Sequence, residues 1–243
     1  MKYLFIVLGI IVLGFVGYHA VRIGFLLTKV QKLNAQASKY ERDLPRADGR
    51  ILIAGDSSAV GVGAGKPEES VAGLFGADFG RMDIVNIGES GLRLGGLERK
   101  LYDLDEQRYD MIVIMIGTND ITEYIPIGTA EQNLKDVLEM VTKMSNRVII
   151  MHSGNMAFAP FFPDFMKGSL QKRTLAFREF YQRLADEYKV AYVDLYGDSP
   201  YDLKNPNNPS LYAEDGLHLN SEGYKLWYHR IRESATQARI DLR

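Results

Sequence analysis

The sequence predicts an α/β protein. We expect a three-layer α/β/α sandwich of the flavodoxin-like kind, with a five-stranded parallel sheet, preceded by an N-terminal transmembrane helix. Short runs rich in Ile and Val recur along the body, and longer amphipathic stretches separate them. Strands that alternate with helices pair in parallel through right-handed crossovers, and the helices then cover both faces of the sheet. A third observation, an uncharged apolar stretch at the N-terminus, predicts the membrane helix.

The N-terminal stretch from residue 3 to residue 18 has no charged side chain and is nearly all Leu, Ile, Val, Phe or Gly. It is long enough to cross a membrane, and it has no polar face, so a buried core helix is disfavoured. A cleaved signal peptide also begins with a cation such as Lys2 before an apolar run. However, this run is longer than a usual signal peptide core, and the residues around Ala20 match a cleavage site poorly. We therefore expect an uncleaved anchor, with secretion after cleavage as the alternative.

The charges beside the anchor give opposing signals about its orientation. Lys2 and the terminal amine favour a cytoplasmic N-terminus, whereas Arg22, Lys29 and Lys32 favour the opposite orientation. Because the chain starts like an export signal, we expect the body to be extracytoplasmic.

Composition limits the classes of function. The chain is 46% hydrophobic and 25% charged, as in an ordinary globular protein. It has no Cys, which excludes disulfides, thiolate zinc sites and a cysteine nucleophile. After residue 32 it holds 25 basic and 31 acidic residues, and a body this acidic is repelled by a phosphate backbone, so no nucleic-acid partner is expected. The predicted parts of the chain are a transmembrane anchor or signal segment (1–28), a stalk or linker (29–49) and the folded body (50–243).

Five apolar runs in the body are too short for buried helices and are the predicted strands: 51–54, 84–87, 111–116, 148–151 and 190–195. Between them, residues 134–144 and 175–188 show apolar side chains at helical spacing. In open parallel sheets the active site lies at the carboxyl ends of the strands. The residues that follow each run are therefore the candidates for chemistry.

The first predicted strand leads into Ser57. At a turn from strand to helix, an exposed hydroxyl meets backbone N–H groups that can hold a developing oxyanion. A serine at such a place is more often only a turn former or a helix cap. Gly61, Gly63 and Gly65 follow it, but no Gly-Lys-Ser/Thr comes after them and the spacing is not that of a dinucleotide loop, so nucleotide binding is not expected.

Three further polar segments follow later runs. Residues 86–91 and 117–120 come directly after the second and third runs and are rich in Gly, Asn and Asp, which also suits ordinary loops. Near the C-terminus, Asp215 precedes His218 by three residues, so its carboxylate can reach one imidazole nitrogen while the other faces the cleft, as a general base requires. The remaining histidines are interpreted as structural: His19, His152 and His229.

In this order, the four segments resemble the SGNH hydrolase superfamily, also called GDSL-type esterases and lipases. The resemblance covers the body from about residue 50 to residue 234. One departure is visible, because Ser58 stands where the family has its name-giving Leu. That Leu has no chemical role in the family's mechanism, so the catalytic expectation is unchanged.

The resemblance implies a serine hydrolase that cleaves carboxylic esters through an acyl-enzyme, with no metal and no organic cofactor. It implies the following roles: Ser57 as nucleophile, His218 as base, Asp215 as the acid that orients it, and Ser57, Gly91 and Asn119 as oxyanion-hole donors. The expected partners are a small-molecule, lipid or glycan ester, such as a lysophospholipid or an O-acetylated carbohydrate, and the membrane through the N-terminal helix.

Three alternatives stay open. The same fold supports acyl transfer to a sugar or another alcohol in place of water. The body could instead be a non-catalytic, membrane-tethered binding module. The third alternative is a metal-dependent hydrolase using Asp56, Asp120, Asp215 and His218, although the chain lacks a second histidine at ligand spacing.

Residues 155–166, after the fourth run, contain four Phe, two Met and two Pro. The prolines oppose a regular helix, so we expect a loop or a broken helix at the same edge as Ser57. Apolar surface on a loop is costly to leave in water, so it either packs on the body or lines a binding site. We take Phe158, Phe161 and Phe162 as candidate walls of an acyl pocket and expect a preference for hydrophobic acyl groups.

Overall fold

All five predicted runs form strands of one sheet in the computed structural model, which describes residues 2–104, 107–197 and 208–237. The strands are β1 (Gly49–Gly55), β2 (Met82–Asn86), β3 (Met111–Met115), β4 (Val148–Met151) and β5 (Ala191–Tyr192). Their order in the sheet is β2-β1-β3-β4-β5, and every neighbouring pair is parallel. The predicted parallel sheet is therefore confirmed.

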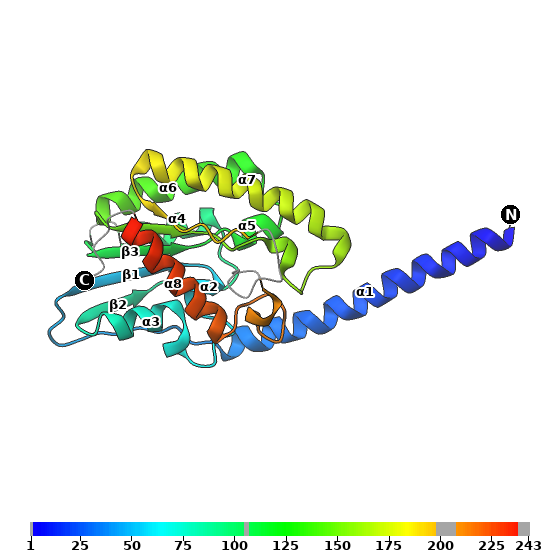
Figure 1. Ribbon diagram of the computed structural model, residues 1–243, viewed down its shortest axis with the longest axis horizontal. Helices are drawn as coiled ribbons and strands as arrows, with labels where there is room; N and C mark the ends of the chain where they lie inside the picture. Colours follow the sequence, from blue (N-terminus) through cyan, green and yellow to red (C-terminus); the bar gives the residue numbers. More distant parts are fainter. Residues whose placement is uncertain (1, 105–106, 198–207, 238–243) are drawn as a thin grey trace.

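Helices cover both faces of this sheet, as the ribbon in Figure 1 shows. One face carries α4 (Leu94–Tyr102), α6 (Ile127–Met144) and α7 (Asp164–Tyr188), and the other carries α3 (Val71–Asp78) and α8 (Ser221–Gln237). Successive side chains of a strand point to opposite faces, so Leu52 packs in the first core and Ile53 in the second. Because both faces are covered, the inner strands β3 and β4 are continuously apolar and do not alternate with polar residues.

Short helical pieces cluster where the strands end. They are α2 (Ser57–Val60), α5 (Thr118–Thr122) and the 3-10 helices η1 (Pro67–Glu69), η2 (Met156–Phe158) and η3 (Pro209–Leu211). The apolar run at 190–195 forms a shorter strand than predicted, since its ladder pairs only Ala191 and Tyr192 with β4. The chain then turns at Asp194, whose carboxylate accepts a hydrogen bond from the N–H of Tyr196 at 3.1 Å.

Before the sheet, the chain forms one continuous helix, α1 (Lys2–Gln36), which projects from the body with the N-terminus at its far end (Figure 1). By length and composition this helix could cross a membrane, as an anchor or as a signal sequence. It passes through residue 28 without a break, so the predicted anchor and stalk share one element.

The chain between α1 and β1 is fixed along the edge of the sheet. Arg42 forms an antiparallel bridge with Ile84 of β2. Its guanidinium also donates hydrogen bonds to the carbonyl oxygens of Gly76 and Met82. This part of the predicted stalk is therefore held against the body by hydrogen bonds from Arg42 to backbone carbonyl oxygens.

Candidate active site

Ser57 lies at the turn from β1 into α2, as the sequence predicts. Gly55 has a φ of +147°, and a Cβ atom there would lie only 1.8 Å from the carbonyl oxygen of Met115, so glycine allows β1 to leave the sheet close to β3. The carboxylate of Asp56 then accepts hydrogen bonds from the N–H and hydroxyl of Ser58 at 2.9 and 2.8 Å. This cap sets Ser57 as the first residue of α2, where backbone N–H groups have no partner within the helix.

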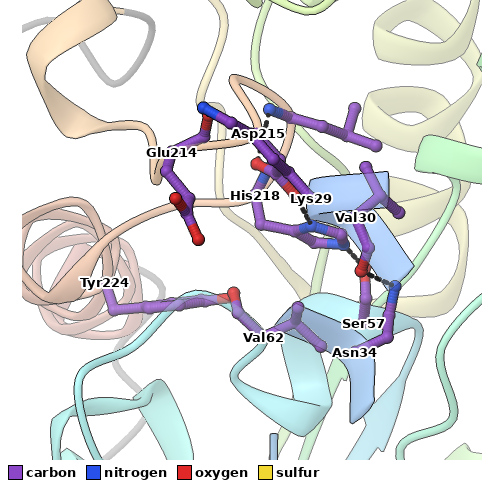
Figure 2. Close-up of polar contacts among 10 residues, drawn as sticks. Lys29, Val30, Asn34, Ser57, Val62, Glu214, Asp215, His218 and Tyr224 are labelled. Carbon is purple, nitrogen blue, oxygen red and sulfur yellow. Dashed lines mark hydrogen bonds and ion pairs between the residues drawn. The ribbon is translucent and has the colours of Figure 1, made fainter. Parts of the chain in front are cut away.

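His218 faces Ser57 from the loop before α8. Asp215 Oδ1 accepts hydrogen bonds from the N–H groups of Leu217 and His218 at 2.9 and 3.0 Å, which folds this loop into a tight turn. The other carboxylate oxygen, Oδ2, accepts from His218 Nδ1 at 2.6 Å. On the far side of the ring, Nε2 lies 3.0 Å from Ser57 Oγ (Figure 2). The structure thus brings the three predicted residues into one chain of contacts.

Hydrogen bonding at this site favours an ionised Asp215 carboxylate. Asp215 is fully buried, and His218 is only 8% exposed. Burial alone would raise the pKa of Asp215, but the hydrogen bonds from the His218 ring and from two backbone N–H groups outweigh it and hold that pKa below its usual value. An ionised Asp215 fixes the proton on Nδ1, so Nε2 is left to accept a proton from Ser57.

The glycines after Ser57 allow the histidine loop to approach. Gly63 has a φ of +92°, and a Cβ atom there would lie 2.3 Å from the carbonyl oxygen of Leu219 and 3.2 Å from His218 Cβ. A larger residue would push the histidine away from Ser57. Close packing of the chain at Gly63 against the histidine loop therefore accounts for this glycine.

A cavity of about 250 Å³ opens beside Ser57 and His218. Of the predicted substrate residues, Phe161 and Phe162 line it, whereas Phe158 is not among its lining residues. Sequence reasoning missed several other side chains of the wall: Tyr212, Leu217, Leu219 and Trp227. The walls are mainly apolar, and the volume lies just below the range of about 300–1,000 Å³ common for pockets that hold drug-sized molecules, which suits a compact acyl group.

Asn119 and Gly91, two of the three predicted oxyanion donors, lie in different surroundings. Asn119 lines the same cavity as Ser57, and its side-chain amide donates to the carbonyl oxygen of Leu92 at 2.9 Å, which leaves its second amide hydrogen for another acceptor. Gly91 has a φ of +80° and lines a neighbouring hollow together with Asp120. Asn119 thus ties the Gly91 loop to the site, and the two oxyanion roles stay predictions.

The residues of the metal alternative do not form a ligand set. In the part of the chain that the structure describes, no group of three His, Cys, Asp or Glu side chains could hold a metal ion. Asp56 caps α2, and Asp120 accepts a hydrogen bond from the N–H of Leu94 at 3.1 Å. Burial raises the pKa of Asp120 to about 6.

Comparison with known proteins agrees with this fold. The model of the GDSL-like lipase/acylhydrolase family matches residues 53–226. A G-D-S-L lipolytic protein from Veillonella parvula has a similar structure, with a TM-score of 0.63 and 20% identity over 77% of this chain and 98% of its own. A search of curated proteins gave no match.

Two esterases of solved structure are also similar. The psychrotrophic esterase EstA from Pseudoalteromonas sp. has a TM-score of 0.57 and 19% identity, over 80% of this chain and 100% of its own. A mutant of Axe2, an acetyl-xylooligosaccharide esterase from Geobacillus Stearmophilus, has a TM-score of 0.56 and 19% identity, over 77% of this chain and 94% of its own. At such identity these likenesses show the fold alone. Since the family model covers most of the body and both similar esterases share its fold, this chain belongs to the GDSL-like lipase/acylhydrolase family.

Proposed function

We propose that the protein is a serine hydrolase that cleaves carboxylic esters through an acyl-enzyme intermediate. The observation that carries this proposal is the chain of contacts from Asp215 through His218 to Ser57 Oγ at the wall of an apolar cavity. Family membership and the ester hydrolases among the similar structures support the same reaction class.

The mechanism follows from the positions of these atoms. Ser57 Oγ attacks the ester carbonyl carbon while His218 Nε2 takes the hydroxyl proton, and Asp215 holds the resulting imidazolium in place. The oxyanion of the tetrahedral intermediate is held by the Ser57 N–H, the Asn119 amide and the Gly91 N–H. His218 then gives its proton to the departing alcohol. In the second half of the reaction His218 takes a proton from water, which attacks the acyl carbon, and His218 returns this proton to Ser57 Oγ as the carboxylic acid leaves.

The cavity favours hydrophobic acyl groups of short or medium length. Its apolar walls add about 0.8 kcal/mol for each CH₂ that they remove from water, so chains of a few carbons should react faster than acetate. Lipid esters and glycan esters remain the two candidate substrate classes. Acyl transfer to an alcohol would use the same residues, and product analysis with an added alcohol separates it from hydrolysis.

We also propose that α1 keeps the body at a membrane, with the body on the extracytoplasmic side. The full chain should stay in the membrane fraction at high salt and be released by detergent. A leaderless chain recovered from the native host would show that the helix is a cleaved signal instead. Proteolysis of intact cells, which reaches only an external body, tests the orientation.

Replacing the nucleophile tests the reaction. Ser57→Ala should remove nearly all hydrolysis of a short-chain aryl ester, and a phosphonate ester should label the wild type at Ser57 only. Ser169→Ala, an exposed serine on α7, is the matched control and should keep both activity and labelling. Turnover of the wild-type order in Ser57→Ala would exclude the serine mechanism, provided that circular dichroism shows the same fold.

A further inference from the structure

The two halves of α1 have different surroundings. From Tyr3 to Tyr18 every side chain is exposed. Beyond that point, half-buried positions recur at helical spacing: His19, Arg22, Ile23, Leu26, Lys29, Val30, Leu33 and Asn34. One face of the second half therefore packs against the body, whereas the side chains of the first half stay exposed on every face of the helix.

The packed half of α1 is tied to the rim of the active site. Arg22 donates hydrogen bonds to the carbonyl oxygens of Pro160 and Phe161 at 2.5 and 3.1 Å. The N–H of Phe161 in turn donates to the carbonyl oxygen of Gly216 at 3.0 Å, between Asp215 and His218. The helix thus contacts the aromatic segment that lines the cavity, and that segment contacts the catalytic loop.

Further along α1, two lysines contact the same loop. Lys29 donates to the carbonyl oxygen of Glu214 at 3.1 Å, and Lys32 forms an ion pair with its carboxylate at 2.9 Å. Figure 2 shows Lys29, Glu214 and the Asp215–His218 pair in one view. These contacts, made at both ends of the packed half, fix the direction in which the cavity faces relative to the free half of α1.

The contacts also fix the height of the cavity above a membrane. About 20 helical residues, at a rise of about 1.5 Å each, cross a hydrocarbon core of about 30 Å. Counted from Tyr3, such a span ends near Arg22, beside Phe161. The ring of Phe165 lies 6.2 Å from that of Phe15 and 5.4 Å from that of His19, and Phe165 is 64% exposed. This ring is therefore level with the last turns of the membrane span.

We propose that the exposed ring of Phe165 rests in the bilayer that holds α1, and that the cavity takes its ester directly from this bilayer. The inference rests on the proposed ester hydrolysis and narrows its substrate to an ester whose acyl chain lies in the membrane. An exposed Phe ring at this depth is buried among lipid chains and no longer in contact with water. Water is the co-reactant, and the products are a carboxylic acid and an alcohol.

The absence of Cys from the chain allows a direct test of depth. In the full chain, Phe165→Cys carries a single nitroxide label after reconstitution into phosphatidylcholine and phosphatidylglycerol vesicles. The label should be accessible to oxygen and protected from a water-soluble nickel chelate. Tyr102→Cys is the matched control, because Tyr102 is 76% exposed at the end of α4, where the chain leads to the start of β3. Its label should show the reverse pattern of accessibility. Equal exposure of both labels to the nickel chelate would overturn the proposal.

A second arm measures turnover. The rate on a lipid ester with an acyl chain of medium length, carried in the same vesicles, is divided by the rate on a water-soluble short-chain ester. This ratio should fall about tenfold or more in Phe165→Asp, since burial of a Phe ring contributes at least that factor, and should keep the wild-type value in Tyr102→Asp. An unchanged ratio in Phe165→Asp overturns the membrane-borne substrate but leaves ester hydrolysis intact. Failure of the wild type on both esters overturns the proposed function itself, and the label depth still decides whether Phe165 touches the bilayer.

Discussion

The carboxyl edge of the sheet carries two sets of buried or half-buried polar side chains built from the same residue types. The first set, which we call the Ser57 set, contains Asn119, Asp215 and His218; the second, which we call the β4–β5 set, contains Asn155, Asp194 and His152. Each set holds one amide, one carboxylate and one imidazole near strand ends. Only the Ser57 set meets a serine hydroxyl in a cavity.

The difference lies in what each polar atom does locally. In the β4–β5 set, Asn155 caps η2, Asp194 pairs with Arg178, and His152 Nε2 lies 3.0 Å from the Tyr192 hydroxyl. In the Ser57 set, one oxygen of Asp215 shapes the loop and the other is left for the imidazole. Residue type and position at a strand end therefore do not determine a catalytic role. A role requires a polar atom left over after local structure is satisfied, and a cavity for that atom to face.

Replacing the histidine of each set by glutamine should give the largest difference in activity between the two sets. His218→Gln should lower kcat/KM for a short-chain ester by at least about 10⁴-fold, because among the described residues His218 is the base that contacts Ser57 Oγ. His152→Gln should keep activity of the wild-type order, since His152 does not line the cavity. Steady-state kinetics on both variants checks this, with circular dichroism as the control for folding. Comparable losses in the two variants would mean that the two sets cannot be separated.

The carboxylates give the next contrast. In Asp215→Asn the amide oxygen can still accept the loop N–H groups, but the amide nitrogen then donates to His218 Nδ1 and leaves the proton on Nε2, where a base is needed. We expect kcat to fall by about 10³ to 10⁴-fold with the loop intact. Asp194→Asn removes an ion pair with Arg178 that is about one-third exposed, which contributes at most about 1 kcal/mol, and should leave kcat unchanged. A small effect of Asp215→Asn would mean that the carboxylate only shapes the loop.

The amides separate transition-state binding from capping. Asn119→Ala should lower kcat by about 100 to 1,000-fold with little change in KM, as loss of one oxyanion donor typically does. Asn155→Ala should instead lower the free energy of unfolding by about 1 kcal/mol, through loss of a helix cap, and spare kcat. Kinetics and urea unfolding of both variants decide the matter. A rise in KM alone for Asn119→Ala would make this side chain a ground-state contact.

Much of the fold could be predicted because its signals are local. Each buried strand is a short apolar run, and parallel strand ends share one edge, which brings Ser57 and Asn119 together without knowledge of the packing. The spacing of Asp215 and His218 is also local, since both lie on one turn of the chain.

The remaining features depend on contacts between distant segments. Tyr212 and Trp227 line the cavity, but in sequence they look like an ordinary loop residue and an ordinary core residue of a helix. Likewise, the sequence predicts that Lys29 and Lys32 belong to a stalk or linker, and only the folded chain places them against Glu214. No spacing rule connects residues about 180 positions apart, so the packing of α1 against the catalytic loop was not predicted.

The last expected effect is on stability and not on turnover, and it belongs to His152. Burial penalises the charged imidazole and lowers the pKa of His152 to about 4, against an ordinary value of 6.5. Between these values the unfolded chain binds a proton that the folded chain does not, so the free energy of unfolding falls as the pH falls. For this one group the loss between about pH 7.5 and about pH 5 is about 2 kcal/mol. Burial raises the pKa of Asp120 to about 6, so the titration of Asp120 makes the free energy of unfolding rise as the pH falls. This contribution is the same in the wild type and in the His152 variant.

His152→Gln removes this titration, so its free energy of unfolding should fall about 2 kcal/mol less than that of the wild type over the same pH range. Urea unfolding of the full chain in a non-ionic detergent, followed by circular dichroism at several pH values, measures the difference. His229→Gln, at an exposed position on α8, controls for removal of a histidine as such. If wild type and His152→Gln lose stability in parallel, His152 takes up its proton in the folded chain as readily as in the unfolded one. The imidazole of the β4–β5 set would then be open to water, contrary to its 2% exposure in the structure.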